Sequence, residues 1–313
     1  MLGHKKQWQF LKKAAEKGKI SHALLFYGPE QTGKRTLAIE FAKFLNCQGA
    51  KKPCGSCKSC QDIEKGTWPD LALVCLKEGK GEIQISQIRG LAWTMSLKPH
   101  SSDFKIAIVD QAHLMNQEAQ NCFLKLLEEP RGNAVLILVT EHPDTLFSTV
   151  LSRVQKIKFF PVGNEEIEKA LVEKGLSAEK AKIFTAFSFG KPGLANSFFE
   201  EPARIEKQKE IVSDLIKISQ ADLSTRFSYA KRMIDEKSED SGKSLKKVLQ
   251  IWLRYFRKVF LLKLAGDSKE KFFNHYSLAK IMEIIRSIQS TESILSTTNA
   301  NPRLALEILL MEI

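Results

Sequence analysis

The sequence predicts an α/β domain built on a mostly parallel sheet, followed by a part that is helical throughout. Short apolar runs alternate with helix-length segments up to about residue 160, whereas only helical patterns follow Phe160-Pro161. Hydrophobic residues make up 43% of the 313 residues, which suits two or three domains of ordinary size. Because helix-length segments between strands provide crossover connections, the first part favours parallel pairing.

Five apolar runs in the first part are the expected strands. They are nearly continuous, which is typical of strands that are buried on both faces. The runs cover residues 22–27, 70–76, 105–110, 134–140 and 154–160. Ligands of such sheets bind at the carboxyl ends of the strands, so we expect a functional site there.

The rest of the chain is expected to be helical. Short helices are predicted over 164–174, 177–189 and 193–199, with Gly175, Gly190 and Pro192 as their stops. Glu200-Glu201-Pro202 marks a boundary before a longer helical part, in which 245–264 is amphipathic and the polar residues 236–244 form a loop. The sequence therefore predicts three domains, over 1–160, 161–203 and 204–313.

Charge and composition limit the compartment and the partners. The net charge is +12, and because the basic excess is spread over both parts of the chain, an anionic partner is expected without a single basic tail. No apolar run approaches the roughly 20 residues of a membrane span, and the polar start shows no secretion signal. We expect a cytoplasmic protein whose six cysteines are thiols or metal ligands.

A glycine loop between the first apolar run and an amphipathic helix has the order of a phosphate-binding P-loop. Its backbone N–H groups and its lysine would face phosphate. The candidate nucleotide-binding residues are Gly28, Pro29, Glu30, Gln31, Thr32, Gly33, Lys34, Arg35 and Thr36. Position 35 normally carries the Ser or Thr that holds Mg²⁺, and an arginine cannot be a metal ligand. Metal-assisted hydrolysis is therefore doubtful, and whether the loop binds ATP or ADP stays open.

A second motif departs from the active pattern in the same direction. Asp110 ends the third apolar run, where a Walker-B aspartate would hold the metal ion, but the next residue is Gln111. A glutamine cannot accept a proton as a general base. The alternative is that Asp110 is an ordinary cap or turn residue at the end of a strand.

Four cysteines fall within 14 residues, as Cys47, Cys54, Cys57 and Cys60. This number and spacing, with Gly55 allowing a tight turn, indicate a tetrahedral structural zinc site with no open position. An iron–sulfur site and unligated thiols are the alternatives. Cys75 and Cys122 are expected to be small core residues.

Together these motifs resemble the clamp-loader branch of the AAA+ proteins. The matching stretches include HALLFYGPEQTGK, LNC with PCGSCKSC, KIAIVDQAHLMNQEAQNCFLKLLEEP, LSR at 151–153, GKPGLA and NPRLALEILL, which together span residues 20–310. The resemblance implies a RecA-like domain with an inserted zinc module, a small helical lid and a helical collar that joins subunits into a ring. It also implies that the chain is a component of the DNA polymerase III holoenzyme.

The resemblance assigns roles to further residues. Arg153 matches the arginine that reaches the ATP of the adjacent subunit, although Val154 replaces a cysteine of that motif; the alternative is a surface arginine. Thr140 falls at the sensor-1 position, and Gly193 stands where motor subunits carry the sensor-2 arginine. Arg89 lies on a helix near DNA in the family, or is a solvated arginine. Glu128-Glu129 is either a solvated face or an intersubunit contact.

The resemblance implies a subunit of the DNA polymerase III clamp loader that helps to load the sliding clamp onto primed DNA. We expect a stator with little or no ATPase activity, which lends Arg153 to a neighbour. Its expected partners are the gamma/tau and delta subunits of a hetero-pentameric ring, the sliding clamp and primer-template DNA, with no membrane. The alternatives are an active gamma/tau-like motor subunit, which Arg35 and Gln111 disfavour, and a free-standing zinc-dependent nucleic-acid binder.

Overall fold

The computed structural model describes residues 2–100, 103–130, 132–235, 241–264, 276–298 and 300–313, with the backbone alone at 241–244 and 296–297. It divides into two compact units, Met1–Phe199 and Glu200–Ile313. The first unit holds the sheet and nine α-helices within the described residues, and the described part of the second is helical.

The sheet of the first unit has five parallel strands in the order β2-β3-β4-β1-β5. The strands are β1 (Ala23–Tyr27), β2 (Leu71–Val74), β3 (Lys105–Val109), β4 (Ala134–Thr140) and β5 (Gln155–Lys158). All five predicted strands are present, each within the predicted range. β3 and β4 are buried throughout and β1 almost so, whereas the edge strands are partly exposed. The expectation of burial on both faces was therefore wrong for β2 and β5, which lie at the two edges of the sheet, where solvent reaches the side chains.

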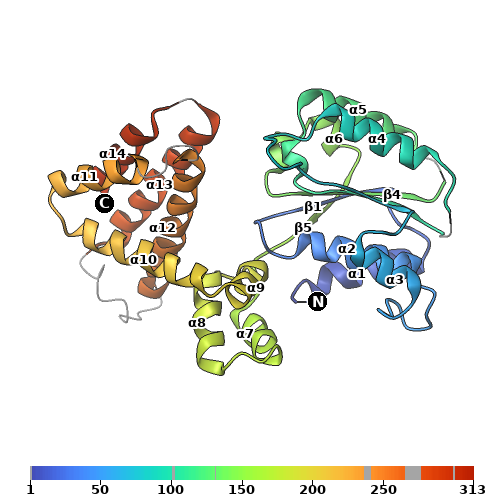
Figure 1. The fold of residues 1–313 in the computed structure, drawn as a ribbon, viewed down its shortest axis with the longest axis horizontal. Helices are drawn as coiled ribbons and strands as arrows, with labels where there is room; N and C mark the ends of the chain where they lie inside the picture. Colours follow the sequence, from blue (N-terminus) through green and yellow to red (C-terminus); the bar gives the residue numbers. More distant parts are fainter. Residues whose placement is uncertain (1, 101–102, 131, 236–240, 265–275, 299) are drawn as a thin grey trace. The chain divides into compact units, whose positions relative to one another are not determined.

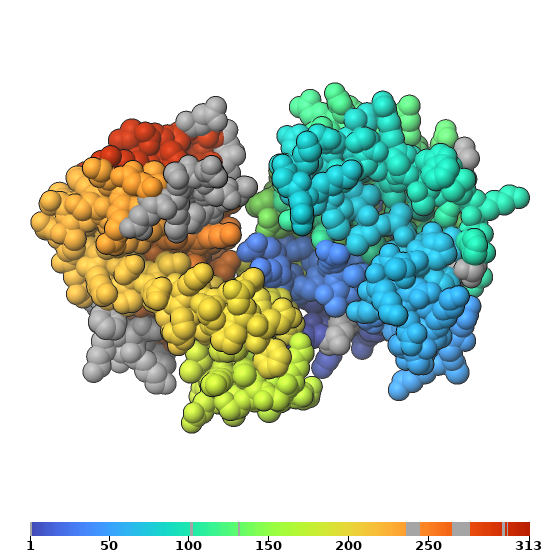
Figure 2. All heavy atoms as spheres, viewed as in Figure 1, coloured from blue at the N-terminus to red at the C-terminus, as the bar shows by residue number. Residues whose placement is uncertain are grey.

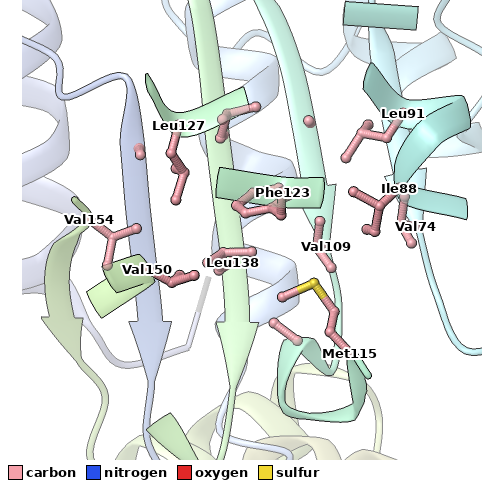
Figure 3. Close-up of a cluster of buried hydrophobic side chains, with 14 of the residues drawn as sticks. Val74, Ile88, Leu91, Val109, Met115, Phe123, Leu127, Leu138, Val150 and Val154 are labelled. Atoms are coloured by element: carbon pink, nitrogen blue, oxygen red, sulfur yellow. The ribbon is translucent and has the colours of Figure 1, made fainter. Parts of the chain in front are cut away.

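Helices cover both faces of the sheet (Figure 1). The helices α1 (Lys5–Glu16), α2 (Lys34–Asn46) and α3 (Lys58–Lys65) lie on one face, where their apolar residues pack with Phe26 and Ile108. The other face carries α4 (Ile85–Ser96), α5 (Gln117–Glu128) and α6 (Ser148–Leu151). There Ile88, Leu91 and Phe123 meet the side chains of β3 and β4 (Figure 3). The result is the three-layer RecA-like arrangement that the sequence predicts.

Three short helices complete the first unit. They are α7 (Asn164–Glu173), α8 (Ala178–Ser188) and α9 (Pro192–Glu200), each within two residues of its predicted bounds. Phe189 and Gly190 between α8 and α9 both have positive φ, and the N–H of Val162 donates to the carbonyl of Gly190 at 2.7 Å. A side chain at Gly190 would lie 2.7 Å from Pro161, so only glycine fits this turn.

The second unit is built from five helices within the described residues. They are α10 (Ala203–Ser219), α11 (Leu223–Asp235), α12 (Ser241–Leu264), α13 (Leu278–Thr297) and α14 (Pro302–Glu312). Trp252 and Phe256 of α12 are fully buried at the centre of the core. The predicted loop over 236–244 was wrong at its end, because α12 begins at Ser241; residues 236–240 lie outside the described part. Among the described helices, none is long and apolar enough to cross a bilayer.

Candidate functional site: a phosphate-loop cleft and a cysteine cluster

The carboxyl ends of β1, β3 and β4 meet at one edge of the sheet and form a cleft of about 390 Å³. The strands are neighbours in the sheet, so the segments that follow them lie side by side. The cleft is lined by Glu30, Gln31, Gly33, Lys34, Arg35, Thr36, Asp110, Gln111, His113, Val139, Thr140, Glu141 and Gly193. Topology therefore brings the P-loop, the Walker-B-like pair and the sensor-1 position into one site.

Lys34 is the first residue of α2, and its side chain folds back over the loop. Its Nζ donates to the carbonyl oxygens of Gly28 at 2.7 Å and Pro29 at 2.6 Å. Burial lowers the pKa of Lys34 from its ordinary value to about 8, although the carboxylates of Glu141 and Asp110 oppose the shift. The carbonyl dipoles of the loop thus hold the Lys34 ammonium in a buried position, where a bound anion would stabilise its positive charge.

Arg35 pairs with the Walker-B-like aspartate. Its Nη1 lies 3.3 Å from Oδ2 of Asp110, while Oδ1 of Asp110 accepts from the N–H of Gln111 at 3.0 Å. The second bond is the strand-end cap that the sequence left open as an alternative. Gln111 has a left-handed φ of 51° and lines the cleft. Arg35 and Gln111, the two residues that depart from the active pattern, therefore both contact the carboxylate of Asp110.

The end of β4 carries a small polar cluster in the same cleft. Thr140 is buried, its Oγ1 lies 3.3 Å from Nδ1 of His113, and it accepts from the N–H of His142 at 3.1 Å. Oε1 of Glu141 lies 3.6 Å from Nε2 of His113 and 3.7 Å from Nε2 of His142. Sequence analysis missed His113, which lies three residues after Asp110 in a 3₁₀ turn (Ala112–Leu114).

Helix α9 contacts the P-loop directly. The N–H of Gly193 donates to the carbonyl of Gln31 at 2.9 Å, and a Cβ at Gly193 would stand 3.0 Å from that oxygen. Lys191 pairs with Glu30 at 3.1 Å. A side chain at position 193 would therefore crowd this backbone contact. No feature of the sequence alone indicated this close approach.

The remaining loop residues support the cleft from behind. Thr32 is fully buried, its hydroxyl donates to the carbonyl of Pro29 at 2.8 Å, and its own carbonyl lies 2.7 Å from Nε2 of His4. Burial lowers the pKa of His4. Gly28, at φ 141°, passes so close to Phe159 that a Cβ would lie 2.3 Å from its carbonyl oxygen. Gly28, Pro29 and Thr32 thus shape the loop and do not line the cleft.

Arg153 lies apart from the residues that line this cleft. It follows α6 and is partly exposed, and its Nη2 pairs with Oε1 of Glu128 at 3.0 Å. Its Nη1 donates to the carbonyl of Thr149 at 3.1 Å. Glu128 is therefore engaged within the chain. Arg89 is an exposed residue of α4 and also lies outside the cleft.

The four cysteines of the predicted zinc module come together. Their Sγ atoms all lie within 4.8 Å of one another. Tetrahedral zinc with Zn–S bonds of about 2.3 Å needs sulfurs about 3.8 Å apart, and those of Cys47 and Cys57 are 4.0 Å apart. Cys47 and Cys60 are buried, and the loop that joins α2 to α3 lies at the outer surface of the unit (Figures 1 and 2). The cluster could bind a metal ion and is compatible with structural zinc.

Backbone N–H groups also point at these sulfurs. Cys47 Sγ accepts from Gly49 at 3.4 Å and from Cys54 at 3.3 Å, and Cys54 Sγ accepts from Cys57 at 3.3 Å. A Cβ at Gly49 would lie 2.9 Å from the Cys54 side chain, so the turn needs this glycine, which sequence analysis missed. Burial raises the pKa of Cys60 to about 12, whereas a hydrogen bond with Ser59 lowers the pKa of Cys57 to about 5. The donor set thus fits a thiophilic dication.

The two remaining cysteines lie away from this cluster. Cys122 is a half-buried residue of α5 that packs against the core, as predicted. Cys75 was expected within a strand but comes directly after β2, where it is half-buried and burial raises its pKa.

Residues 3–163 match the protein family described as "DNA polymerase III, delta subunit". The chain belongs to this family. The motifs resemble those of the delta-prime subunit of bacterial DNA polymerase III, a prediction that this match and a delta' relative confirm. That relative, from Bacillus subtilis (strain 168), is 37% identical over 176 residues, which cover 56% of this chain and 53% of the relative.

Other relatives carry the names of different subunits of the same polymerase. The chain is 27% identical to the Bacillus subtilis tau subunit, over 85% of this chain and 50% of that protein. It also resembles the crystal structure of a gamma subunit-related protein from Thermotoga maritima, with 19% identity, a TM-score of 0.46 and 97% of each chain covered. The chain thus spans about half the length of the curated relatives it matches. Membership of the family leaves open which subunit's role the chain performs.

Proposed function

We propose that this protein is a clamp-loader subunit of DNA polymerase III that helps to load the sliding clamp onto primed DNA as a largely non-hydrolysing stator. The observation that carries the proposal is the ion pair between Arg35 and Asp110, with Gln111 beside it. Hydrolysis by this class of site needs a hydroxyl and an aspartate on Mg²⁺ and a residue that activates or orients water. Here position 35 offers no hydroxyl, Asp110 is paired with a cation, and the amide of Gln111 cannot take a proton from water.

We propose that Arg153 acts in trans on the ATP of a neighbouring subunit. A planar guanidinium at the γ-phosphate stabilises the charge that develops during phosphoryl transfer. Arg153 does not line the chain's own cleft, and its partial exposure leaves it accessible to another subunit. The ion pair with Glu128 is between partly exposed groups, so exchanging it for a phosphate contact costs little, about 1 kcal/mol or less.

The test is the ATPase of the reconstituted loader. Replacing Arg153 with alanine should lower turnover at the neighbour's site by about 10³-fold, so that the loader loses the share which that site contributes. Assembly, followed by size-exclusion chromatography, should not change. Glu128→Gln is the matched control, because it removes the same ion pair and leaves the arginine in place. If the loader that contains Arg153→Ala kept the ATPase rate of the unchanged loader, the proposal that Arg153 acts in trans would be rejected.

The rival proposal is an active gamma/tau-like motor subunit, which the match to a tau relative favours. The two proposals differ in the behaviour of the isolated chain. A stator should show no ATP turnover above that of Lys34→Ala. Steady hydrolysis by the purified chain, lost in Lys34→Ala, would establish the motor reading and reject the stator.

The second unit is proposed as the collar that joins subunits into a hetero-pentameric ring with gamma/tau and delta subunits. Leu304, Ile308 and Met311 of α14 are 56%, 64% and 59% exposed and recur at helical spacing, so they form an apolar stripe on one side of the helix. Such a stripe favours contact with another protein. Leu304→Glu combined with Ile308→Glu should abolish assembly without unfolding the chain.

Further proposals concern the lid, DNA and zinc. The helices of 161–203 are proposed as the lid over the cleft, supported by the contact of Gly193 with Gln31. Arg89, exposed on α4, is proposed as a phosphate contact of primer-template DNA. Zinc is proposed as the metal of the cysteine cluster, which would fix the connection between α2 and α3. We also propose that the protein is located in the bacterial cytoplasm.

A further inference from the structure

The position that normally binds magnesium is occupied by a cation of the chain itself. Arg35 lies in the first turn of α2, and its Nη1 lies 3.3 Å from Oδ2 of Asp110. The Asp110 side chain is 19% exposed, whereas that of Arg35 is 48% exposed and lines the cleft. The guanidinium therefore stands at the cleft surface, over a largely buried carboxylate.

These residues do not fit a magnesium ion. Mg²⁺ requires oxygen ligands at about 2.0–2.1 Å in near-octahedral geometry. The hydroxyl expected at position 35 is missing, and the Arg35 guanidinium lies against Oδ2 of Asp110, while Oδ1 accepts from the N–H of Gln111. An ion at Asp110 would have to displace a guanidinium and then remain beside it. Repulsion between the two cations opposes this arrangement.

The same cleft nevertheless retains the features that bind phosphate. Lys34 and Arg35 open the 13-residue helix α2, whose N-terminus favours anions. The buried ammonium of Lys34 is bonded to the carbonyls of Gly28 and Pro29, and burial lowers its pKa to about 8, so a nearby anion would stabilise its charge. A volume of about 390 Å³ is within the usual range for small-ligand sites.

We propose that this cleft binds a nucleoside di- or triphosphate without a magnesium ion, with the Arg35 guanidinium in the metal's place beside Asp110. The inference rests on the proposed function in one respect, because it concerns a cleft that we propose does not hydrolyse ATP. A guanidinium has five N–H donors, so it can keep its bond to Asp110 while donating to phosphate oxygens. Lys34 would contact the same phosphates from the loop side.

The experiment is an equilibrium titration of the full-length chain with ADP and with ATP, by isothermal calorimetry, in magnesium and in EDTA. The dissociation constants of the unchanged protein should differ by less than about threefold between the two buffers. Arg35→Thr restores the hydroxyl and frees Asp110, so its nucleotide binding should become at least about tenfold tighter in magnesium than in EDTA. The thermal unfolding of Arg35→Thr should match that of the unchanged protein, which shows that the variant folds.

Two controls separate charge from position. Arg257→Thr removes an exposed arginine from α12 in the other unit and should leave both constants unchanged. Arg35→Lys keeps the charge and should stay independent of magnesium. The proposal is overturned if magnesium tightens binding to the unchanged protein about tenfold or more, or if neither nucleotide binds in either buffer. Neither result affects the Arg153 test, which reads the neighbour's site.

Discussion

The phosphate-loop cleft and the cysteine cluster lie in the same unit but differ in whether their ligand-binding groups already have partners within the chain. In the cleft, the groups that a nucleotide and its metal would engage already have partners within the chain: Lys34 bonds to loop carbonyls and Arg35 to Asp110. In the cluster, backbone N–H groups point at sulfurs that together could bind a metal ion. A motif can therefore keep its backbone shape while its side-chain chemistry is replaced.

The difference between the two sites follows from which groups of the protein bind the ligand. A structural metal site has all its positions filled by the protein, so losing any one of them removes the site. A phosphate loop binds mainly through backbone N–H groups and a helix N-terminus, which survive changes of side chain. Substitution at position 35 or 111 therefore alters metal binding and hydrolysis without destroying the loop.

The largest effect is expected at Cys60. Replacing it with serine removes a buried ligand, so the zinc content should fall from about one ion per chain to almost none, and the melting temperature should fall with it. Elemental analysis of protein prepared under reducing conditions measures the first effect, and calorimetry measures the second. Cys122→Ser, at a half-buried site outside the cluster, should keep its metal. If Cys60→Ser also kept it, the cluster would not be a metal site.

A smaller effect is expected at Gly49. Its N–H donates to Cys47, and an added Cβ would lie 3.0 Å from the Sγ of Cys54, so alanine should displace this sulfur and weaken zinc binding about tenfold. Competition with a chromophoric chelator measures the affinity. Gly81→Ala is the matched control, because a Cβ there meets nothing within 4 Å. Equal affinities for the two variants would show that the turn at Gly49 adapts without cost.

The smallest effect is a pH dependence from Lys34. Its pKa is about 8 in the folded chain and near 10.4 when unfolded, so between these values the unfolded state binds more protons and the free energy of unfolding rises with pH. The gain between about pH 8 and pH 9 should be at most about 1 kcal/mol, after allowance for screening by solvent. Urea unfolding of the unchanged protein and of Lys34→Met measures it. Parallel pH profiles for the two would contradict the buried charge.

Much of the fold is readable from local pattern. The sequence predicted β1, β3 and β4 because these strands are buried and their apolar runs are continuous. The partial exposure of β2 and β5 was not predicted, because which strands lie at the edges depends on the strand order of the sheet. The start of α12 at Ser241 was missed since the polar residues before Leu245 carry no apolar period. His113 and Gly49 had no signal of their own, because their roles depend on where the chain folds back.

The sequence by itself determined the motifs and their departures: the P-loop, Arg35 after the lysine, Gln111 after the aspartate, and four cysteines at metal-ligand spacing. Residue type decides these, since an arginine cannot be a metal ligand and a glutamine cannot be a base. Only the tertiary structure decided that Arg35 reaches Asp110, 75 residues away, and that Gly193 meets Gln31. Such contacts depend on which strands become neighbours, and strand order is set by the packing of the whole unit.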